Sequence, residues 1–328
     1  MTKLAFPVAF VSHGGGPLPL MGDADHRELV AACAQLRQQL PDNPSAIIVI
    51  SAHWESRGFA VTSQPEPPLL FDYSGFPEQT YRYQYGAKGE PELAVKLQSA
   101  LATKNIALRL DANRGFDHGV FVPLMLMYPE ADIPVLELSI DCGLSAREHL
   151  MFGQKLAEVL PPDVLVLGSG FSFHNLPAFF AQKTTQSIAA CAEFNTWLNH
   201  TLVDSSISAE ARLNRLDHWS DAPQARFCHP REEHLMPLLV CAAMTKAPAQ
   251  ALPFSVMGYG AQHYLWLREP LDNSGAALAS SKFRGLGAAS KAYRGLSRSR
   301  NNAHGICWKP RRARPLAAIR CVELLAKG

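Results

Sequence analysis

Short hydrophobic runs alternate along the chain with longer segments in which hydrophobic and polar residues recur at helical spacing. The hydrophobic runs cover residues 5–12, 47–50, 59–63, 106–110, 133–140 and 164–167. Continuous apolar runs of this length are typical of strands buried on both faces. Helical spacing covers residues 25–40, 90–104, 146–160 and 187–202. Strands that alternate with helices predict a single α/β domain with a central, mostly parallel sheet flanked by helices.

The pattern changes after residue 217. Residues 217–228 are predicted to form a loop, and Pro230 suits the first turn of a helix that continues through Ala243. His234 would then lie in the first turn of this helix, and His229 is best explained as its N-terminal cap. Residues 253–257 and 263–267, separated by Gly258-Tyr259-Gly260, predict a final β-hairpin.

Histidines stand at the ends of several predicted elements. His13, His53 and His174 each follow a buried strand in a turn of small residues, His118 follows a weaker strand, and His234 opens a helix. A single histidine of this kind is more often a structural cap than a ligand. In open α/β sheets, however, ligands bind at the carboxyl ends of the strands. Five histidines so placed predict a metal site at those ends, holding Fe, Zn, Cu or Ni in preference to Mg or Ca.

Two loops offer further chemistry. Gly14-Gly15-Gly16 could bring backbone close to a ligand, but no G-K-[ST] or G-x-G-x-x-G pattern is present, so a phosphate cradle is not expected. Residues 72–86 are rich in aromatic side chains. This loop could line a pocket for an aromatic substrate, and packing over the core explains it equally well.

Charge divides the chain into two parts. Residues 271–328 hold 12 Lys and Arg against Asp272 and Glu323, whereas the first 270 residues hold 19 basic and 27 acidic residues. A mildly acidic body is poorly suited to binding nucleic-acid phosphates. We therefore expect one folded domain over residues 1–270 and a basic, poorly ordered extension over 271–328. A read-through or frame-shifted extension explains the tail better than a nucleic-acid or membrane arm, because the basic run lacks interleaved aromatic residues.

Cysteine use and hydropathy bear on the compartment. The chain has seven cysteines and no C-x-x-C pair, which favours reduced thiols in a cytoplasmic protein over a disulfide framework. No stretch approaches the length of a membrane span, and the N-terminus lacks a secretory hydrophobic region. We expect no membrane partner, and the oligomeric state is left open.

Five motifs together resemble class III extradiol ring-cleavage dioxygenases of the LigB superfamily, in the branch of the 4,5-DOPA dioxygenases. In chain order they are Ser12-His13-Gly14-Gly15-Gly16-Pro17, Ser51-Ala52-His53-Trp54, Phe116-Asp117-His118-Gly119, Gly168-Ser169-Gly170 with His174-Asn175-Leu176, and His229-Pro230-Arg231-Glu232-Glu233-His234-Leu235. The resemblance covers roughly residues 5 to 268. It implies an enzyme that opens a catechol ring outside the two hydroxyls, using both atoms of O2, to give a muconic semialdehyde.

The same resemblance implies roles for the histidines. His13, His53 and His234 would hold one divalent metal, Fe(II) for activity or Zn(II) as found. His174 would be a further ligand or a base, and His118 an acid/base group beside the metal. Ring-cleaving dioxygenases commonly use two histidines and one carboxylate, so three imidazoles would leave the metal's full 2+ charge. On a helix Glu233 and His234 would point in different directions and would not both bind the metal.

Two other classes of function fit the histidines. A zinc hydrolase would use the cluster to activate water, but the chain has no H-E-x-x-H motif and no obvious acid to serve as the base. A non-catalytic binding protein on the same fold would have a degenerate site, and the full set of histidines argues against it.

Overall fold

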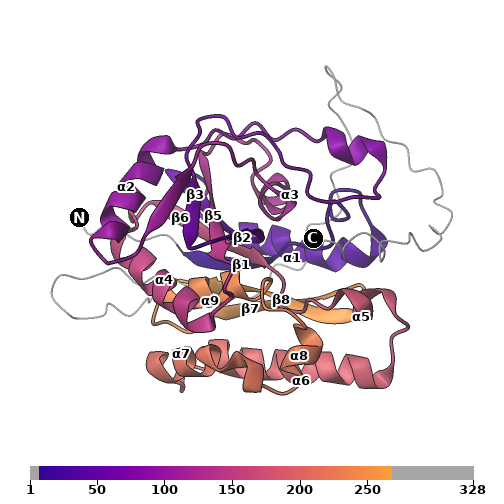
Figure 1. Ribbon diagram of the computed structural model, residues 1–328. Coiled ribbons are helices and arrows are strands. Elements are labelled where there is room, and N and C mark those ends of the chain that lie inside the picture. Colours follow the sequence, from indigo (N-terminus) through magenta and orange to yellow (C-terminus); the bar gives the residue numbers. More distant parts are fainter. Residues whose placement is uncertain (1–6, 268–328) are drawn as a thin grey trace. The chain divides into compact units, whose positions relative to one another are not determined.

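One twisted sheet organises the part of the chain that the computed structural model describes, residues 7–267 (Figure 1). The sheet has the strand order β4-β3-β5-β2-β6-β1-β8-β7. The strands are β1 (Val8–Ser12), β2 (Ala46–Ser56), β3 (Phe59–Thr62), β4 (Leu108–Asp111), β5 (Val135–Asp141), β6 (Val164–Gly170), β7 (Gln250–Val256) and β8 (Tyr259–Trp266).

The middle of the sheet is parallel. β5, β2, β6 and β1 pair in parallel in that order, and β3 pairs with β4 in the same way. Antiparallel pairs join β3 to β5, β1 to β8, and β7 to β8. The predicted α/β fold with a mostly parallel sheet is therefore confirmed, and so is the final hairpin. Because the four central strands run in one direction, their carboxyl ends meet at one edge of the sheet.

Helices cover both faces of the sheet. The helices of the described chain are α1 (Arg27–Arg37), α2 (Pro91–Ala102), α3 (His118–Met127), α4 (Ala146–Val159), α5 (Leu176–Phe180), α6 (Thr185–Val203), α7 (Ala209–Asp217), α8 (Ala225–Cys228) and α9 (Met236–Ala243), with 3-10 turns η1 (Ala24–His26), η2 (Glu78–Arg82) and η3 (Trp219–Asp221). α1 packs against α3, and α9 packs against β1, β2, β6 and α4. Figure 1 shows α1 on one side of the β7–β8 hairpin and α6 on the other.

Tight packing on both faces explains the hydrophobic runs. Ile47, Ile48, Val49 and Ile50 are all fully buried in β2, and burying an aliphatic side chain of this size stabilises a fold by about 1.5–3 kcal/mol. Gly168 lets α9 approach the sheet, since a Cβ there would lie 2.7 Å from the carbonyl oxygen of Pro237.

Strand β2 runs further than its hydrophobic run. His53 lies inside β2 and not in a turn after it, which corrects the expectation from the sequence. The pairing of β2 with β5 shifts register between Ile50 and Glu55. Such irregularities are common in strands near functional sites. Here the regular pairing with β5 is interrupted around His53, and the strand continues to Ser56.

The segment before α9 also differs from expectation. The helix begins at Met236, with Pro237 in its first turn, and not at Pro230. Residues 229–235 form an irregular segment whose backbone binds elsewhere, because His234 accepts a hydrogen bond from the amide of Phe171. The predicted loop over residues 217–228 contains η3 and α8. His229 closes α8 and is fully buried, and its Nε2–H donates to Ser172, so it does not cap a helix start.

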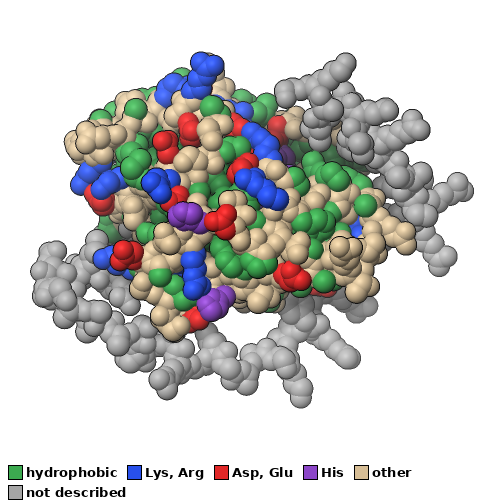
Figure 2. All heavy atoms as spheres, turned by 60° about the horizontal axis from the view of Figure 1, so that its bottom comes forward, with side chains coloured by type: hydrophobic (Ala, Val, Ile, Leu, Met, Phe, Trp, Pro, Cys, Tyr) green, Lys and Arg blue, Asp and Glu red, His purple; other side chains and the backbone are tan. Residues whose placement is uncertain are grey.

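The surface mixes both charges. Figure 2 shows Lys, Arg, Asp and Glu side chains interspersed with hydrophobic ones on one face of the described residues. The five described cysteines, Cys33, Cys142, Cys191, Cys228 and Cys241, are free thiols. Within residues 7–267, no helix has both the length and the apolar character needed to cross a membrane. The basic tail predicted over residues 271–328 lies outside the described residues.

Candidate metal centre

Three histidines from distant parts of the chain meet at the carboxyl edge of the sheet. His13 directly follows β1, His53 lies near the end of β2, and His234 precedes α9. One ligand atom from each of the three lies within 4.8 Å of the others. The Nε2 atoms of His13 and His53 are 3.0 Å apart. His13 and His234 are buried and His53 is partly exposed, so the group opens to solvent on one side.

The end of β6 holds this arrangement together. β6 lies between β1 and β2, so His13 and His53 flank it. Gly170, its last residue, has no side chain, and a Cβ there would lie 2.2 Å from the carbonyl oxygen of His234. The amide of Phe171 donates to that same oxygen at 3.0 Å. The close approach of two backbones therefore brings His234 to the other two histidines.

The glycine-rich turn after β1 is held by a hydrogen bond to His26. The amide of Gly15 donates to Nε2 of His26 at 3.1 Å, and Nδ1–H of His26 donates to Asp23 at 2.8 Å. Gly14 adopts a φ of 91°, which glycine accommodates without strain. Burial lowers the pKa of His26, partly offset by Asp23. The amide of this turn therefore binds His26 of the same chain.

A hydroxyl fixes the orientation of His13. Nδ1 of His13 lies 2.9 Å from Oγ of Ser169, whose own hydrogen goes to the carbonyl oxygen of Gly119. Since the hydroxyl has one hydrogen, it accepts from Nδ1–H of His13. The lone pair of His13 is therefore at Nε2, facing His53.

Asp72 performs the same task for two histidines. Its Oδ1 accepts from Nδ1–H of His118 at 2.8 Å, and its Oδ2 lies 3.5 Å from Nδ1 of His53. The imidazole rings of His53 and His118 are 3.9 Å apart between centroids. Burial would raise the pKa of Asp72, but the hydrogen bonds from His118 and the charges of His118 and His53 together lower it. The carboxylate is ionised and acts only as an acceptor.

Glu233 serves the opposite side of the cluster. Its Oε1 lies 2.9 Å from Nδ1 of His234 and 3.3 Å from Nδ1 of His174. The rings of His174 and His234 are stacked, with centroids 3.4 Å apart. Burial would raise the pKa of Glu233, and hydrogen bonds from the two histidines lower it instead. Glu233 is not on a helix, so the expectation that it points away from His234 is wrong.

Burial keeps the three central imidazoles neutral. Burial and the neighbouring histidines lower the pKa of His13 and of His234 well below the ordinary value. Burial and His118 lower the pKa of His53 to about 4, against the opposing effect of Asp117 and Asp72. Neutral imidazole is the form that binds a metal ion.

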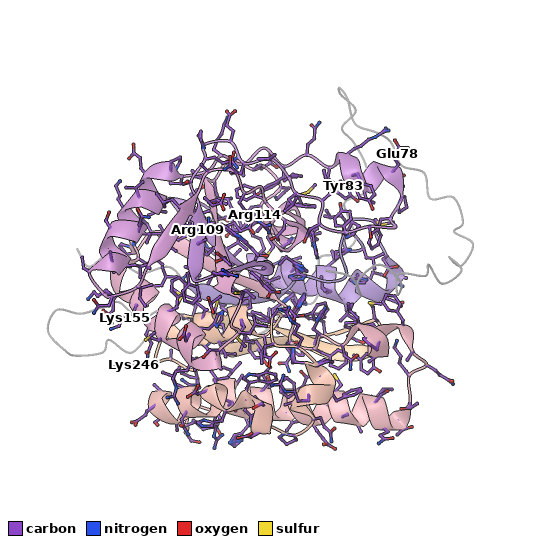
Figure 3. All side chains as sticks on the ribbon, viewed as in Figure 1. Glu78, Tyr83, Arg109, Arg114, Lys155 and Lys246 are labelled. Carbon is purple, nitrogen blue, oxygen red and sulfur yellow. The ribbon has the colours of Figure 1, made fainter. Side chains whose placement is uncertain are left out.

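A buried charge network around Arg114, which is labelled in Figure 3, supports the backbone behind the site. Arg114 donates to Asp117 at 2.7 Å and to Glu137 at 3.3 Å, and it also reaches the carbonyl oxygen of His53. Asp117 precedes α3 and accepts from the hydroxyl of Ser51. Burial and Asp117 raise the pKa of Glu137 well above its usual value, against the effect of Arg114. The network ties β2, β5 and the start of α3 together.

Aromatic side chains line the loop that carries Asp72. Tyr73 meets His118 edge-on at 5.9 Å between ring centroids and contacts Tyr81 and Phe76. A Cβ on Gly16 would lie 3.3 Å from the ring of Phe76, so this loop also packs against the glycine-rich turn. The predicted aromatic loop therefore lies beside the histidines. Its side chains pack against the glycine-rich turn, and the same loop is close enough to the histidines to contact a substrate bound there.

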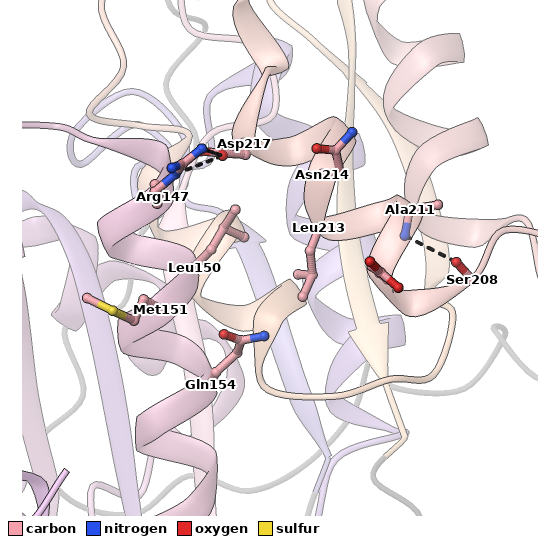
Figure 4. Close-up of a pocket in the computed structure, with 10 residues that line it drawn as sticks. Arg147, Leu150, Met151, Gln154, Ser208, Ala211, Leu213, Asn214 and Asp217 are labelled. Carbon is pink, nitrogen blue, oxygen red and sulfur yellow. Dashed lines mark hydrogen bonds and ion pairs between the residues drawn. The ribbon is translucent and has the colours of Figure 1, made fainter.

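A separate groove lies between α4 and α7 (Figure 4). It has a volume of about 550 Å³, and an ion pair between Arg147 and Asp217 lies at its edge. None of the five histidines lines it. We therefore place no part of the candidate site there.

The donor set fits a divalent metal of the iron or zinc type. Two nitrogens bonded to one such metal at about 2.1 Å lie roughly 3 Å apart, which matches the separation of the His13 and His53 Nε2 atoms, 3.0 Å. Both Nδ1 atoms face oxygen, so both Nε2 lone pairs point at each other, and a cation between them removes that repulsion. Asp72 and Glu233 lie next to the imidazoles, so the metal's 2+ charge would be balanced outside the ligand shell.

A mostly parallel α/β sheet with an imidazole cluster at its carboxyl edge is an arrangement typical of metal-dependent enzymes, and comparison with known proteins gives the family. Residues 8–264 match the family described as the catalytic LigB subunit of aromatic ring-opening dioxygenase. The dioxygenase tasH of Hapsidospora irregularis is 36% identical over 252 residues, covering 72% of this chain and 77% of that protein. The 4,5-DOPA dioxygenase extradiol of Beta vulgaris is 35% identical over 264 residues, covering 78% and 95%.

Bacterial relatives agree with this result. The 4,5-DOPA dioxygenase extradiol of Escherichia coli K12 is 34% identical over 240 residues, covering 73% of this chain and 85% of that protein. The crystal structure of an uncharacterized protein from Escherichia coli K12 superposes with a TM-score of 0.62 at 28% identity, covering 79% of this chain and 99% of the other. The chain belongs to the LigB family of class III extradiol dioxygenases, as its motifs predicted. It is an extradiol dioxygenase, an oxidoreductase, and enzymes of this family use a metal.

Several residues of the site were missed by reasoning from the sequence. The structure brings all five predicted histidines together, but Asp72 and His26 were not assigned a part in the site, and Glu233 was considered only as an alternative metal ligand to His234. Asp72 is 46 positions from His118, and no local pattern announces such a contact. The hydrogen bond of Glu233 to its neighbour His234 could have been predicted if the helix had not been expected to begin too early.

Proposed function

We propose that this enzyme opens the ring of a DOPA-like catechol with O2 to give a muconic semialdehyde. In this proposal His13, His53 and His234 hold one divalent metal, with Fe(II) active and Zn(II) able to occupy the same site. The observation that carries it is the 3.0 Å separation of the His13 and His53 Nε2 atoms, both with their lone pairs turned inward. The relatives named as 4,5-DOPA dioxygenases support the choice of substrate class.

The neighbouring histidines take the proton-transfer roles. His118 is an acid/base group beside the metal, and His174, stacked on His234, is either a fourth ligand or a base. A metal bound here supplies a Lewis-acidic position at which a vicinal diol and O2 can meet. Histidine suits proton transfer because its ordinary pKa lies near neutral pH. Tyr73 and its aromatic neighbours form one wall against which a flat catechol ring can lie.

The proposed catalytic domain covers residues 1–270. The family match over residues 8–264 accounts for most of it. We propose that the basic extension over residues 271–328 takes no part in metal binding or ring cleavage, and that the enzyme works in the cytoplasm on small molecules.

Anaerobic loading with Fe(II), followed by air and a panel of catechols, tests the function. We expect a yellow ring-opened product from L-DOPA or a related catechol, with both oxygen atoms of 18O2 recovered in it by mass spectrometry. The Zn(II)-loaded protein and a chelator-treated sample should give no product. Absence of ring cleavage with every catechol, from protein that binds one Fe(II) per chain, would overturn the proposal.

The variant His13→Ala tests the ligand assignment. Removing one of three nitrogens should cost metal and activity together, because the remaining site has too few ligands to compete with water. Metal content is measured by atomic emission after gel filtration. His200→Ala, at an exposed position on α6, is the matched control. Full metal content in His13→Ala would show that His13 is not a ligand.

A further inference from the structure

One carboxylate faces both histidines on one side of the cluster, with two hydrogen bonds from His118 and a longer contact to His53. Oδ1 of Asp72 accepts from both the backbone amide and Nδ1–H of His118, at 3.0 and 2.8 Å. Its Oδ2 lies 3.5 Å from Nδ1 of His53. The side chain of Asp72 is only 19% exposed. Asp72 is in the aromatic loop before η2, so it reaches the cluster from outside the sheet edge.

We propose that Asp72 is a positioning residue of the ring-cleavage reaction. It fixes His118 and His53 in the tautomer with hydrogen on Nδ1, so that the Nε2 lone pair of each ring is available in the site. The inference rests on the proposed function for the roles of His118 and His53. It adds a residue that touches neither metal nor substrate and acts through two histidines that do.

The tautomer decides what His118 does. With hydrogen on Nδ1, its Nε2 accepts the proton of a bound hydroxyl: the O–H bond breaks, an N–H bond forms, and the oxygen keeps the electron pair. The positive imidazolium then lies against the Asp72 carboxylate at 2.8 Å. A carboxylate that orients a histidine in this way is worth up to roughly 10⁴-fold in turnover in hydrolases that depend on it.

Asparagine cannot replace Asp72 in this task. Its amide has one acceptor oxygen, and its nitrogen carries two hydrogens that must face one of the two rings. An NH2 group facing Nδ1 requires the ring to move its hydrogen to Nε2, which removes the inward lone pair. Glutamate keeps both acceptor oxygens at a slightly greater reach.

Glu233 provides an internal comparison on the other side of the cluster. It joins Nδ1 of His234 to Nδ1 of His174, and both of those histidines are candidate ligands. Loss of Glu233 should therefore weaken metal binding, by roughly 10–100-fold for a partner of ligating histidines. Asp72 has its hydrogen bonds to His118 and only a longer contact, 3.5 Å, to the proposed ligand His53, so its loss should mainly reduce turnover at saturating metal. Two carboxylates in equivalent positions thus have different predicted effects.

The experiment compares Asp72→Asn, Asp72→Glu and Glu233→Gln, with Asp42→Asn as an exposed control. At saturating Fe(II), Asp72→Asn should keep its metal and lose roughly 10²–10⁴-fold in kcat, with KM within about threefold of the wild type. Asp72→Glu should recover part of kcat, and Asp42→Asn should behave as wild type. Glu233→Gln should require more Fe(II) for half-saturation.

A spectroscopic reading tests the tautomer without turnover. In 15N NMR of the metal-free protein, with the two rings assigned by comparison with His118→Gln and His53→Gln, both wild-type rings should carry hydrogen on Nδ1, and in Asp72→Asn at least one of them should lose this state. An Nε2–H ring in the wild type would overturn the inference, as would kcat within about threefold of wild type in Asp72→Asn, or metal loss in step with activity. A wild type that shows the Nδ1–H ring but cleaves no catechol would overturn the proposed function alone.

Discussion

At the scale of single residues, the candidate centre depends on which nitrogen of each imidazole faces inward. Ser169, Asp72 and Glu233 take the Nδ1 side of His13, His53 and His234. Oxygen acceptors at Nδ1 orient a ring and raise the basicity of its other nitrogen. Three neutral ligands and two nearby carboxylates would give a site of little net charge around a divalent ion. A catechol that arrives with two hydroxyls must then lose protons to bases at the site.

Replacing His118 separates metal binding from proton transfer. His118→Ala or His118→Phe should leave metal content near normal, because Nδ1 of this ring is bound to Asp72 and the three proposed ligands remain. Turnover should fall by roughly 10²–10⁴-fold, the usual worth of general acid/base catalysis. Metal content and kcat are measured on the same preparation, with His200→Ala as the control. Loss of metal from these variants would show that His118 is itself a ligand.

At the scale of elements, the end of β6 determines where His234 lies. The strand itself could be predicted from its apolar residues. Its last residue, Gly170, is important because it has no side chain. A Cβ there would meet the carbonyl oxygen of His234 at 2.2 Å and its carbon at 3.1 Å. These are backbone atoms, which cannot turn aside as a flexible side chain can.

Gly170→Ala should therefore disturb both stability and metal binding. Overpacking of a buried position commonly costs about 1–3 kcal/mol, and the segment that must shift carries a proposed ligand. We expect a lower urea midpoint and weaker Fe(II) binding in titrations. Gly86→Ala is the matched control, since an added Cβ there meets nothing within 4 Å. Wild-type stability together with wild-type metal affinity in Gly170→Ala would contradict this view of the β6 end.

At the scale of the whole molecule, buried neutral histidines make the fold sensitive to acid. His229 and His263 are fully buried, and burial lowers the pKa of each to about 3. In the unfolded chain each would titrate near 6.5. Between these values the unfolded state binds protons that the folded state does not, so stability is complete above pH 6.5 and falls as the pH drops toward 3.

The free energy of unfolding should fall by about 1.4 kcal/mol per pH unit for each such histidine across this window. Urea unfolding of the metal-free protein between pH 7 and 5 measures the slope without a contribution from metal release. His229→Gln removes one titrating group, so its slope should be shallower by about the same amount. An identical slope in the variant would mean that His229 accepts a proton in the folded state.

The tail belongs to the same scale. Residues 271–328 lie outside the described residues, and their basic composition remains the basis for expecting an extension that does no catalytic work. Truncation after Pro270 should leave metal content and ring cleavage unchanged, because all five histidines and both carboxylates precede it. Unfolding or loss of activity in the truncated enzyme would show that the tail is part of the fold.

The sequence by itself determined the elements and the histidines. Buried strands produce continuous apolar runs and helices produce a period near 3.6, so β1, β3, β5 and α4 were found close to their observed bounds. His13 and His174 could be placed at strand ends because the signals for those ends are local. Five motifs in a fixed order were enough to indicate the family.

Only the tertiary structure decided how those residues work together. Asp72 meets His118 across 46 positions, and Ser169 meets His13 across 156. Such contacts depend on strand order and backbone approach, which no local pattern encodes. The irregular segment before α9 was mistaken for helix because Pro230 suits a helix start, while the hydrogen bond from Phe171 to His234 holds the chain differently. Local propensity indicates which segments form helices and strands. Long-range hydrogen bonds to buried polar groups then determine where each element begins and which way its side chains point.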